Sequence, residues 1–234
     1  MAGPTSPTPP LASRPLTVEW TLPNIITLAR ICLTPVVALL PFIQGYWPKV
    51  IAFVVFLIAA FSDLVDGYLA RRYGTTSQLG ILLDPIADKL LLFATLIPIF
   101  WMTRHPTILA ADKVDYAIKW WGSLPVWVAL LLVGREVLIT VFRFFAKRRG
   151  VVIPAIGAGK LKAVVQNIFI GATIAWFAWK DAIAELRLAG AFREFWDQFH
   201  GWFVAVTLAG AIVLTVYSLL VYLYRYRTLL KVGK

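Results

Sequence analysis

Four aspartates stand in otherwise apolar sequence, and their spacing is the first sign of chemistry in this chain. Asp63 and Asp66 are three residues apart, and Asp84 and Asp88 are four apart. On helices, both spacings place the two side chains on one face. A carboxylate at membrane depth is costly and indicates a functional site. Because the four groups together carry four negative charges, we expect two divalent cations to neutralise them.

The residue types around these aspartates predict which cation and which ligand the site takes. Ligation by oxygen alone favours Mg²⁺ or Mn²⁺ over zinc, which prefers His and Cys. Gly67 leaves the helix backbone open to a ligand, and Ala70 keeps the next turn of that face small. Arg71 can then bind a phosphate from the same face. A short link over residues 74–80 makes the two acidic helices antiparallel neighbours, so their faces converge on one pocket.

Structural ion pairing is the alternative interpretation of these acids. Five further basic residues lie in apolar sequence and could pair with them, namely Arg30, Lys89, Arg135, Arg143 and Lys162. Pairing alone does not explain why Gly67, Ala70, Arg71 and Gly80 accompany the four aspartates. We therefore favour the metal site.

The elements that position these residues are predicted to be membrane-spanning helices. Hydrophobic residues make up 60% of the 234 residues, and the mean hydropathy is +0.77. Stretches near the length that crosses a bilayer, about 20 residues, occur at about 25–45, 49–73, 84–103, 124–146, 160–180 and 202–224. The prediction is an all-α integral membrane protein with six transmembrane helices, the first of them broken by Pro35 and Pro41. Residues 18–25 suggest a short interfacial segment before it, and residues 181–200 an amphipathic surface helix.

Composition and charge complete the predicted organisation. Residues 1–15 are rich in Pro, Ser and Thr and are expected to be a disordered tail rather than a signal peptide. Residues 16–230 form one membrane domain. The net charge of +11 does not indicate nucleic acid, because the bases cluster at helix ends. The compact clusters at 71–72 and 147–149 favour both termini, and the acidic pocket, on the cytoplasmic side of the plasma (inner) membrane.

The acidic segment resembles the signature of the CDP-alcohol phosphotransferase family. The pattern D-x₂-D-G-x₂-A-R-x₈-G-x₃-D-x₃-D matches at every fixed position between Asp63 and Asp88. The resemblance implies six transmembrane helices, two divalent metals, a homodimer, and displacement of CMP from a CDP-linked lipid by an alcohol. It implies that Asp63, Asp66 and Asp84 hold the metals, and that Asp88 is the general base and also touches the second metal. The residues implied to contact the CDP-lipid within this signature are Gly67, Ala70, Arg71 and Gly80.

Three further segments resemble the phosphatidylglycerophosphate synthase branch of the family. They follow the patterns N-x₂-T-x₂-R from Asn24 through Thr27 to Arg30, R-E-x₃-T-x₂-R from Arg135 to Arg143, and G-K-x-K-T-x₂-Q from Gly159 to Gln166. The first segment is implied to contact CDP-diacylglycerol. Ala163 departs from the last pattern, which has Thr there. Arg135, Arg143, Lys160 and Lys162 are expected to form a cationic pocket for glycerol 3-phosphate, although Lys160 could instead be a topology charge.

Other functions stay open at this point. Within the family, the acceptor could be inositol phosphate, serine or phosphatidylglycerol. A cation transporter is the rival from another class, but its acids would be spread through the bilayer, whereas here they gather toward one mouth. A degenerate member that only binds lipid is the third alternative, and the complete acidic set argues against it.

Overall fold

The helices follow from long apolar stretches that end at Pro, Gly or charged residues. The computed structural model describes residues 21–73, 78–105, 114–148 and 157–227. Within these residues there are six α-helices and one short 3₁₀ helix: α1 (Leu22–Leu39), η2 (Leu40–Phe42), α2 (Tyr46–Tyr73), α3 (Gln78–Arg104), α5 (Val126–Arg148), α6 (Gly157–Glu185) and α7 (Ala191–Arg225). The prediction of an all-helical chain is confirmed for this part.

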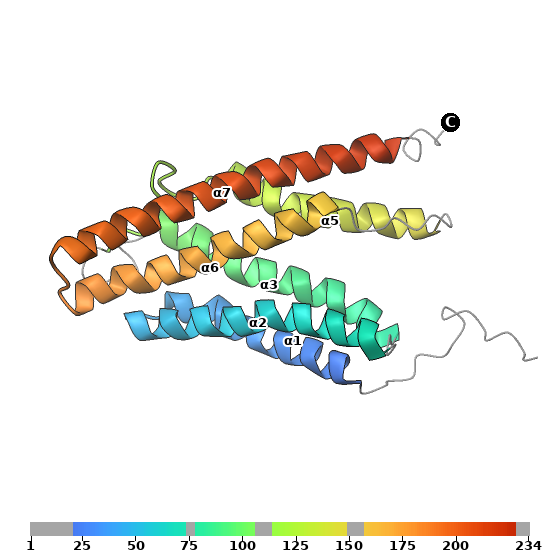
Figure 1. Ribbon diagram of the computed structural model, residues 1–234, viewed down its shortest axis with the longest axis horizontal. Helices are drawn as coiled ribbons and strands as arrows, with labels where there is room; N and C mark the ends of the chain where they lie inside the picture. The colour runs from blue at the N-terminus through green and yellow to red at the C-terminus, as the bar shows by residue number, and fades with distance from the viewer. Residues whose placement is uncertain (1–20, 74–77, 106–113, 149–156, 228–234) are drawn as a thin grey trace, which may run out of the picture.

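The helices run alternately up and down a bundle (Figure 1). α1 packs against α2 and α3, while α6 packs between α2 and α7, and α5 lies against α7 and α3. Buried side chains such as Phe56, Leu96, Phe169 and Leu208 form the core between them. Large apolar side chains such as Val213 stay 65% exposed, which suits a surface that faces lipid. The start of α1, the end of α2 and the end of α7 lie at one end of the bundle (Figure 1).

Five of these helices are long and apolar enough to cross a membrane, so the chain has the character of a multi-pass membrane protein. They are α1 with η2, α2, α3, α6 and α7. The fourth predicted span, 124–146, corresponds to α5, which is 23 residues long but carries Arg135, Glu136 and Arg143. Its charge content separates it from the other five. The six-span prediction is therefore confirmed in part.

The first helix differs from its prediction at both ends. α1 already begins at Leu22, with Pro23 in its first turn, where a missing N–H costs nothing. Residues 22–25 are thus part of a spanning helix and not of a separate interfacial segment, while residues 18–20 lie outside the described part. α1 continues through Pro35, and the break falls at Pro41, in η2.

The predicted surface helix at 181–200 is wrong. Residues 181–185 extend α6, and α7 already begins at Ala191 after a turn in which Gly190 has a φ of +102°. Asp181 is buried rather than exposed. Its carboxylate accepts hydrogen bonds from the Lys49 ammonium and the Tyr116 hydroxyl. These partners, from α2 and from the segment before α5, explain why an acid is tolerated inside a helix bundle.

Candidate active site

One face of α1 carries a line of buried polar side chains that points at the acidic helices. Asn24, Thr27, Arg30 and Thr34 are all buried and recur every three or four residues. That period puts them on one helix face, and α1 packs against α2 and α3, which bear the four aspartates. An apolar helix therefore presents its polar stripe inward, toward the site.

Arg30 brings the two pairs of aspartates together. Its Nη1 donates to Asp63 Oδ1 at 2.8 Å and to Asp88 Oδ1 at 3.2 Å, and its Nη2 donates to Asp66. Its Nε donates to the Ser62 hydroxyl at 3.1 Å. The carboxylates of two helices therefore converge on one guanidinium, as their spacing predicts.

Thr27 links the remaining aspartate to this cluster. Its hydroxyl donates to Asp84 Oδ1 at 3.0 Å and lies 3.4 Å from Asp66 Oδ2. Arg30 and Thr27, which the resemblance assigns to the CDP-lipid, thus contact carboxylates here. Their contact with a lipid, like that of the buried Asn24, stays a prediction.

The other residues of the signature lie where α2 ends and α3 begins. Gly67, Ala70 and Arg71 fall within α2, but their side chains lie outside the described part of the chain. Gly80 lies in the first turn of α3 and is half-buried. The interpretation of Gly67, Ala70, Arg71 and Gly80 as CDP-lipid ligands stays a prediction.

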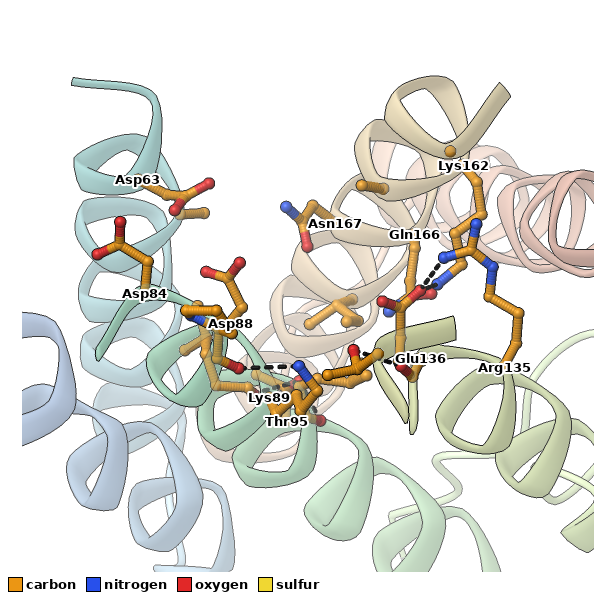
Figure 2. A pocket seen from close by; sticks show the side chains of 18 of the residues that line it. Asp63, Asp84, Asp88, Lys89, Thr95, Arg135, Glu136, Lys162, Gln166 and Asn167 are labelled. Atoms are coloured by element: carbon orange, nitrogen blue, oxygen red, sulfur yellow. Dashed lines mark hydrogen bonds and ion pairs between the residues drawn. The ribbon is translucent and has the colours of Figure 1, made fainter. Parts of the chain in front are cut away.

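A cavity of about 410 Å³ joins the acids to the predicted acceptor residues (Figure 2). Asp63 from α2 and Asp84 and Asp88 from α3 form its acidic wall. The side chains of Asp63 and Asp88 are 47% and 56% exposed, whereas that of Asp66 is only 7% exposed. Asp66 therefore lies behind the wall, while the other three face the space in which a substrate would bind.

The opposite wall is cationic. Arg135 and Arg143 of α5 and Lys160 and Lys162 of α6 all line the same cavity. Segments that are distant in the sequence thus form the predicted cationic pocket, and they form it directly across from the acids. Lys162 is 1% exposed, so it is more than a topology charge, whereas Lys160 is exposed.

Two side chains contact three of these four cations. Glu136 Oε1 accepts hydrogen bonds from Arg135 Nη1 at 2.8 Å and from Lys162 Nζ at 2.7 Å. The ring of Tyr222, from α7, lies 5.6 Å from the Arg135 guanidinium and 5.5 Å from that of Arg143, and its hydroxyl accepts a hydrogen bond from Arg143. In the described part of the chain, the Nε atoms of both arginines are buried without a hydrogen-bond partner. Two guanidinium N–H groups of this wall are therefore not satisfied by any described residue.

The donor chemistry of the acidic wall fits a hard divalent cation. The four carboxylates and the Thr27 hydroxyl converge around Arg30 and offer oxygen alone, which suits Mg²⁺ or Mn²⁺. In the described residues, no three acidic, His or Cys side chains surround a single point as the ligands of one ion would. The side chains meet at Arg30 instead.

Some cavity-lining residues were given no role by sequence reasoning. Gln166 and Asn167 of α6, Thr95 of α3 and Tyr222 of α7 all line it. The sequence does indicate that Gln166 lies at the site, because it follows Lys162 by four residues and therefore shares its helix face. Nothing in the sequence indicates that Tyr222 lies at the site, since only the packing of α7 on α5 brings it to the arginines.

Comparison with known proteins agrees with the family resemblance of the acidic segment. Residues 20–213 match the family model of CDP-alcohol phosphatidyltransferase. A probable phosphatidylglycerophosphate synthase of Mycobacterium tuberculosis is 39% identical over 153 residues, which span 64% of each chain. The CDP-diacylglycerol–glycerol-3-phosphate 3-phosphatidyltransferases of Salmonella choleraesuis and Escherichia coli K12 are 28% identical over 210 residues, 88% of this chain and 94% of theirs. With a family match that covers most of its length and includes every residue of the cavity's acidic wall, the chain belongs to the CDP-alcohol phosphatidyltransferase family.

Proposed function

We propose that this protein transfers a phosphatidyl group from CDP-diacylglycerol to sn-glycerol 3-phosphate, with release of CMP. The observation that carries the proposal is the single cavity with an acidic wall and a cationic wall facing each other. A phosphorylated alcohol needs cations for its phosphate and a base for its hydroxyl. The relatives from Salmonella and Escherichia coli bear the name of this reaction.

The two walls suggest how the acceptor is oriented. Its phosphate binds at Lys162 and Arg135, where charge-assisted hydrogen bonds are strong. Its terminal hydroxyl then points across the cavity toward Asp88. Attack by that hydroxyl oxygen on the lipid-bearing phosphorus forms one P–O bond, and the P–O bond to CMP breaks. The hydroxyl proton goes to the Asp88 carboxylate.

Members of this family generally depend on divalent metals. We propose that Asp63, Asp66, Asp84 and Asp88 hold them, and that the cations neutralise the charge on the pyrophosphate. Arg30 holds three of these carboxylate side chains in place through hydrogen bonds to Asp63, Asp66 and Asp88. Its buried position on α1 makes it a positioning residue for the acids.

Purified protein supplied with CDP-diacylglycerol, Mg²⁺ and glycerol 3-phosphate should release CMP and form phosphatidylglycerophosphate. EDTA should abolish the reaction, and added Mg²⁺ or Mn²⁺ should restore it. Inositol phosphate, serine and phosphatidylglycerol are the comparison acceptors. CMP release with one of these but none with glycerol 3-phosphate would show that the acceptor is wrong. Metal flux into liposomes without turnover of CDP-lipid would favour the transporter instead.

A further inference from the structure

The carbonyl of one amide side chain in the cavity is buried without a hydrogen-bond partner. Gln166 is 5% exposed and lines the cavity, and its Oε1 has no hydrogen-bond partner among the described residues. A buried oxygen without a partner costs about 1–3 kcal/mol, so this atom of a cavity-lining residue is expected to gain a donor when a ligand binds.

The neighbours of Gln166 place it midway along the cavity. Lys162, Gln166 and Ile170 are four residues apart on α6, and all three line the cavity. Along this face of α6, from Lys162 to Ile170, the side chains thus change from a cation to a neutral amide and then to an apolar group. Figure 2 shows Gln166 beside Glu136, in the group with Arg135 and Lys162, across the cavity from the acidic wall. A ligand that reaches from the cations to Asp88 passes this amide.

The chemistry of Oε1 restricts what it can recognise. A carbonyl oxygen accepts hydrogen bonds and donates none. A phosphate dianion has no proton to offer, and Lys162 and Arg135 already supply donors for it. A hydroxyl between the phosphate and the reacting end of the acceptor would satisfy the atom.

We infer that Gln166 is a specificity-determining residue that accepts a hydrogen bond from the non-reacting hydroxyl of a short polyol phosphate. This inference rests on the proposed function. In glycerol 3-phosphate, that group is the C2 hydroxyl, which lies between the phosphate and the hydroxyl that attacks. Gln166 thereby selects polyol phosphates over phosphorylated alcohols with a single hydroxyl.

The test compares glycerol 3-phosphate with 3-hydroxypropyl phosphate, which has the same reacting end and phosphate but lacks the C2 hydroxyl. The wild-type protein should prefer glycerol 3-phosphate by about 10-fold or more in kcat/KM. In Gln166→Met, which keeps the side-chain length, the preference should fall below about 3-fold, because only the better acceptor loses a contact. The ratio is measured within one preparation, so a partly folded variant does not alter it.

Asn167→Met is the matched control, since Asn167 is an amide on the same helix and cavity but is exposed. It should leave the acceptor ratio unchanged. If Gln166→Met slows both acceptors equally, or raises only the KM for CDP-diacylglycerol, the inference is wrong although the proposed function stands. If the wild-type protein turns over neither acceptor but uses another alcohol, the proposed function itself fails.

Discussion

The charges around Arg30 favour a metal site over a structural ion-pair network. Arg30 pairs with Asp63, Asp66 and Asp88, and together with all four aspartates it carries a net charge of −3. The other embedded bases have partners elsewhere: Lys89 donates to the Pro85 carbonyl, Arg135 and Lys162 to Glu136, and Arg143 to Tyr222. Among the ion pairs of the described residues, these acids therefore outnumber the bases that contact them, which favours cation binding.

Asp88→Asn tests the proposed base. The amide cannot accept the hydroxyl proton, so kcat should fall by about 10²-fold or more. Binding of CDP-diacylglycerol should be largely kept, because the other three acids are intact. Steady-state kinetics and direct lipid binding measure the two quantities. Asp197→Asn, which changes an acid far from the cavity, is the control, and a near-normal rate in Asp88→Asn would rule out the base role.

Lys162→Met tests the cationic wall. Loss of a charge-assisted hydrogen bond should raise the KM for glycerol 3-phosphate by about 10- to 100-fold, with little change in the KM for CDP-diacylglycerol. Lys160→Met is the matched control two residues away, because Lys160 is exposed where Lys162 is buried. Its effect should be several-fold smaller. Equal effects of the two substitutions would mean that these lysines act through general charge and not through a contact.

At the scale of elements, α6 is the helix that joins the site to the opposite end of the bundle. Lys162 and Asp181 are nineteen residues apart on it, about 28 Å at about 1.5 Å per residue. This is close to the thickness of the bilayer core, about 30 Å. α6 therefore carries two buried charged groups separated by about the thickness of a bilayer core, and each is paired with a residue of another helix.

Lys49→Met tests the pair at the far end. It leaves Asp181 buried without its cation, which should cost about 3–5 kcal/mol of stability. Thermal unfolding in detergent should show a lower midpoint, while the KM for glycerol 3-phosphate of the folded protein stays unchanged. Lys49→Met combined with Asp181→Leu should recover much of the loss, since no buried charge is left without a partner. A double variant as unstable as the single one would contradict this account.

Tyr116, which donates a hydrogen bond to Asp181, should make the stability of the protein depend on pH. Burial, together with its hydrogen bond to Asp181, raises the pKa of Tyr116 above its ordinary value. A raised pKa means that the stabilisation is complete below about pH 10 and is lost as the pH rises further. The thermal midpoint of the wild-type protein should thus fall above about pH 10, and less steeply in Tyr116→Phe. Parallel alkaline slopes would show that Tyr116 is not responsible.

Sequence patterns predict the parts of this molecule that depend on local spacing. The four aspartates converge because residues three or four apart share a helix face, and the apolar stretches yield five helices able to span a membrane. Asp181 was misplaced on a surface helix because its partners, Lys49 and Tyr116, are more than sixty residues away in sequence. The N-x₂-T-x₂-R pattern links Arg30 to the CDP-lipid, and its place in the sequence shows only that it could pair with an acid, because Asp63 and Asp88 are more than thirty residues away. Sequence patterns do not predict contacts between helices that are far apart in the sequence.

For the whole molecule, the site residues gather at one end of the bundle. α2 ends and α3 and α6 begin near the acidic and cationic walls, and the link between α6 and α7 lies at the opposite end (Figure 1). Residues 71–72 lie at the end of α2 and residues 147–148 at the end of α5, both at the end of the bundle with the site (Figure 1). Cytoplasmic segments are enriched in Lys and Arg. We therefore propose that the cavity opens to the cytoplasm. On that side, both glycerol 3-phosphate and the CDP moiety of the lipid substrate are accessible.

Cysteine labelling in intact cells tests this orientation. The single cysteine, Cys32, is first changed to Ser, and then one cysteine is introduced at Gly157 or at Ala189. Gly157 opens α6 at the end with the site, and a Cβ there meets no atom within 4 Å. Ala189 is exposed in the turn between α6 and α7, at the opposite end. A thiol reagent that does not cross membranes should label Ala189→Cys in intact cells, but Gly157→Cys only after permeabilisation. The reverse pattern would place the cavity outside and would be incompatible with a cytoplasmic acceptor, because a phosphate dianion does not cross the bilayer unaided.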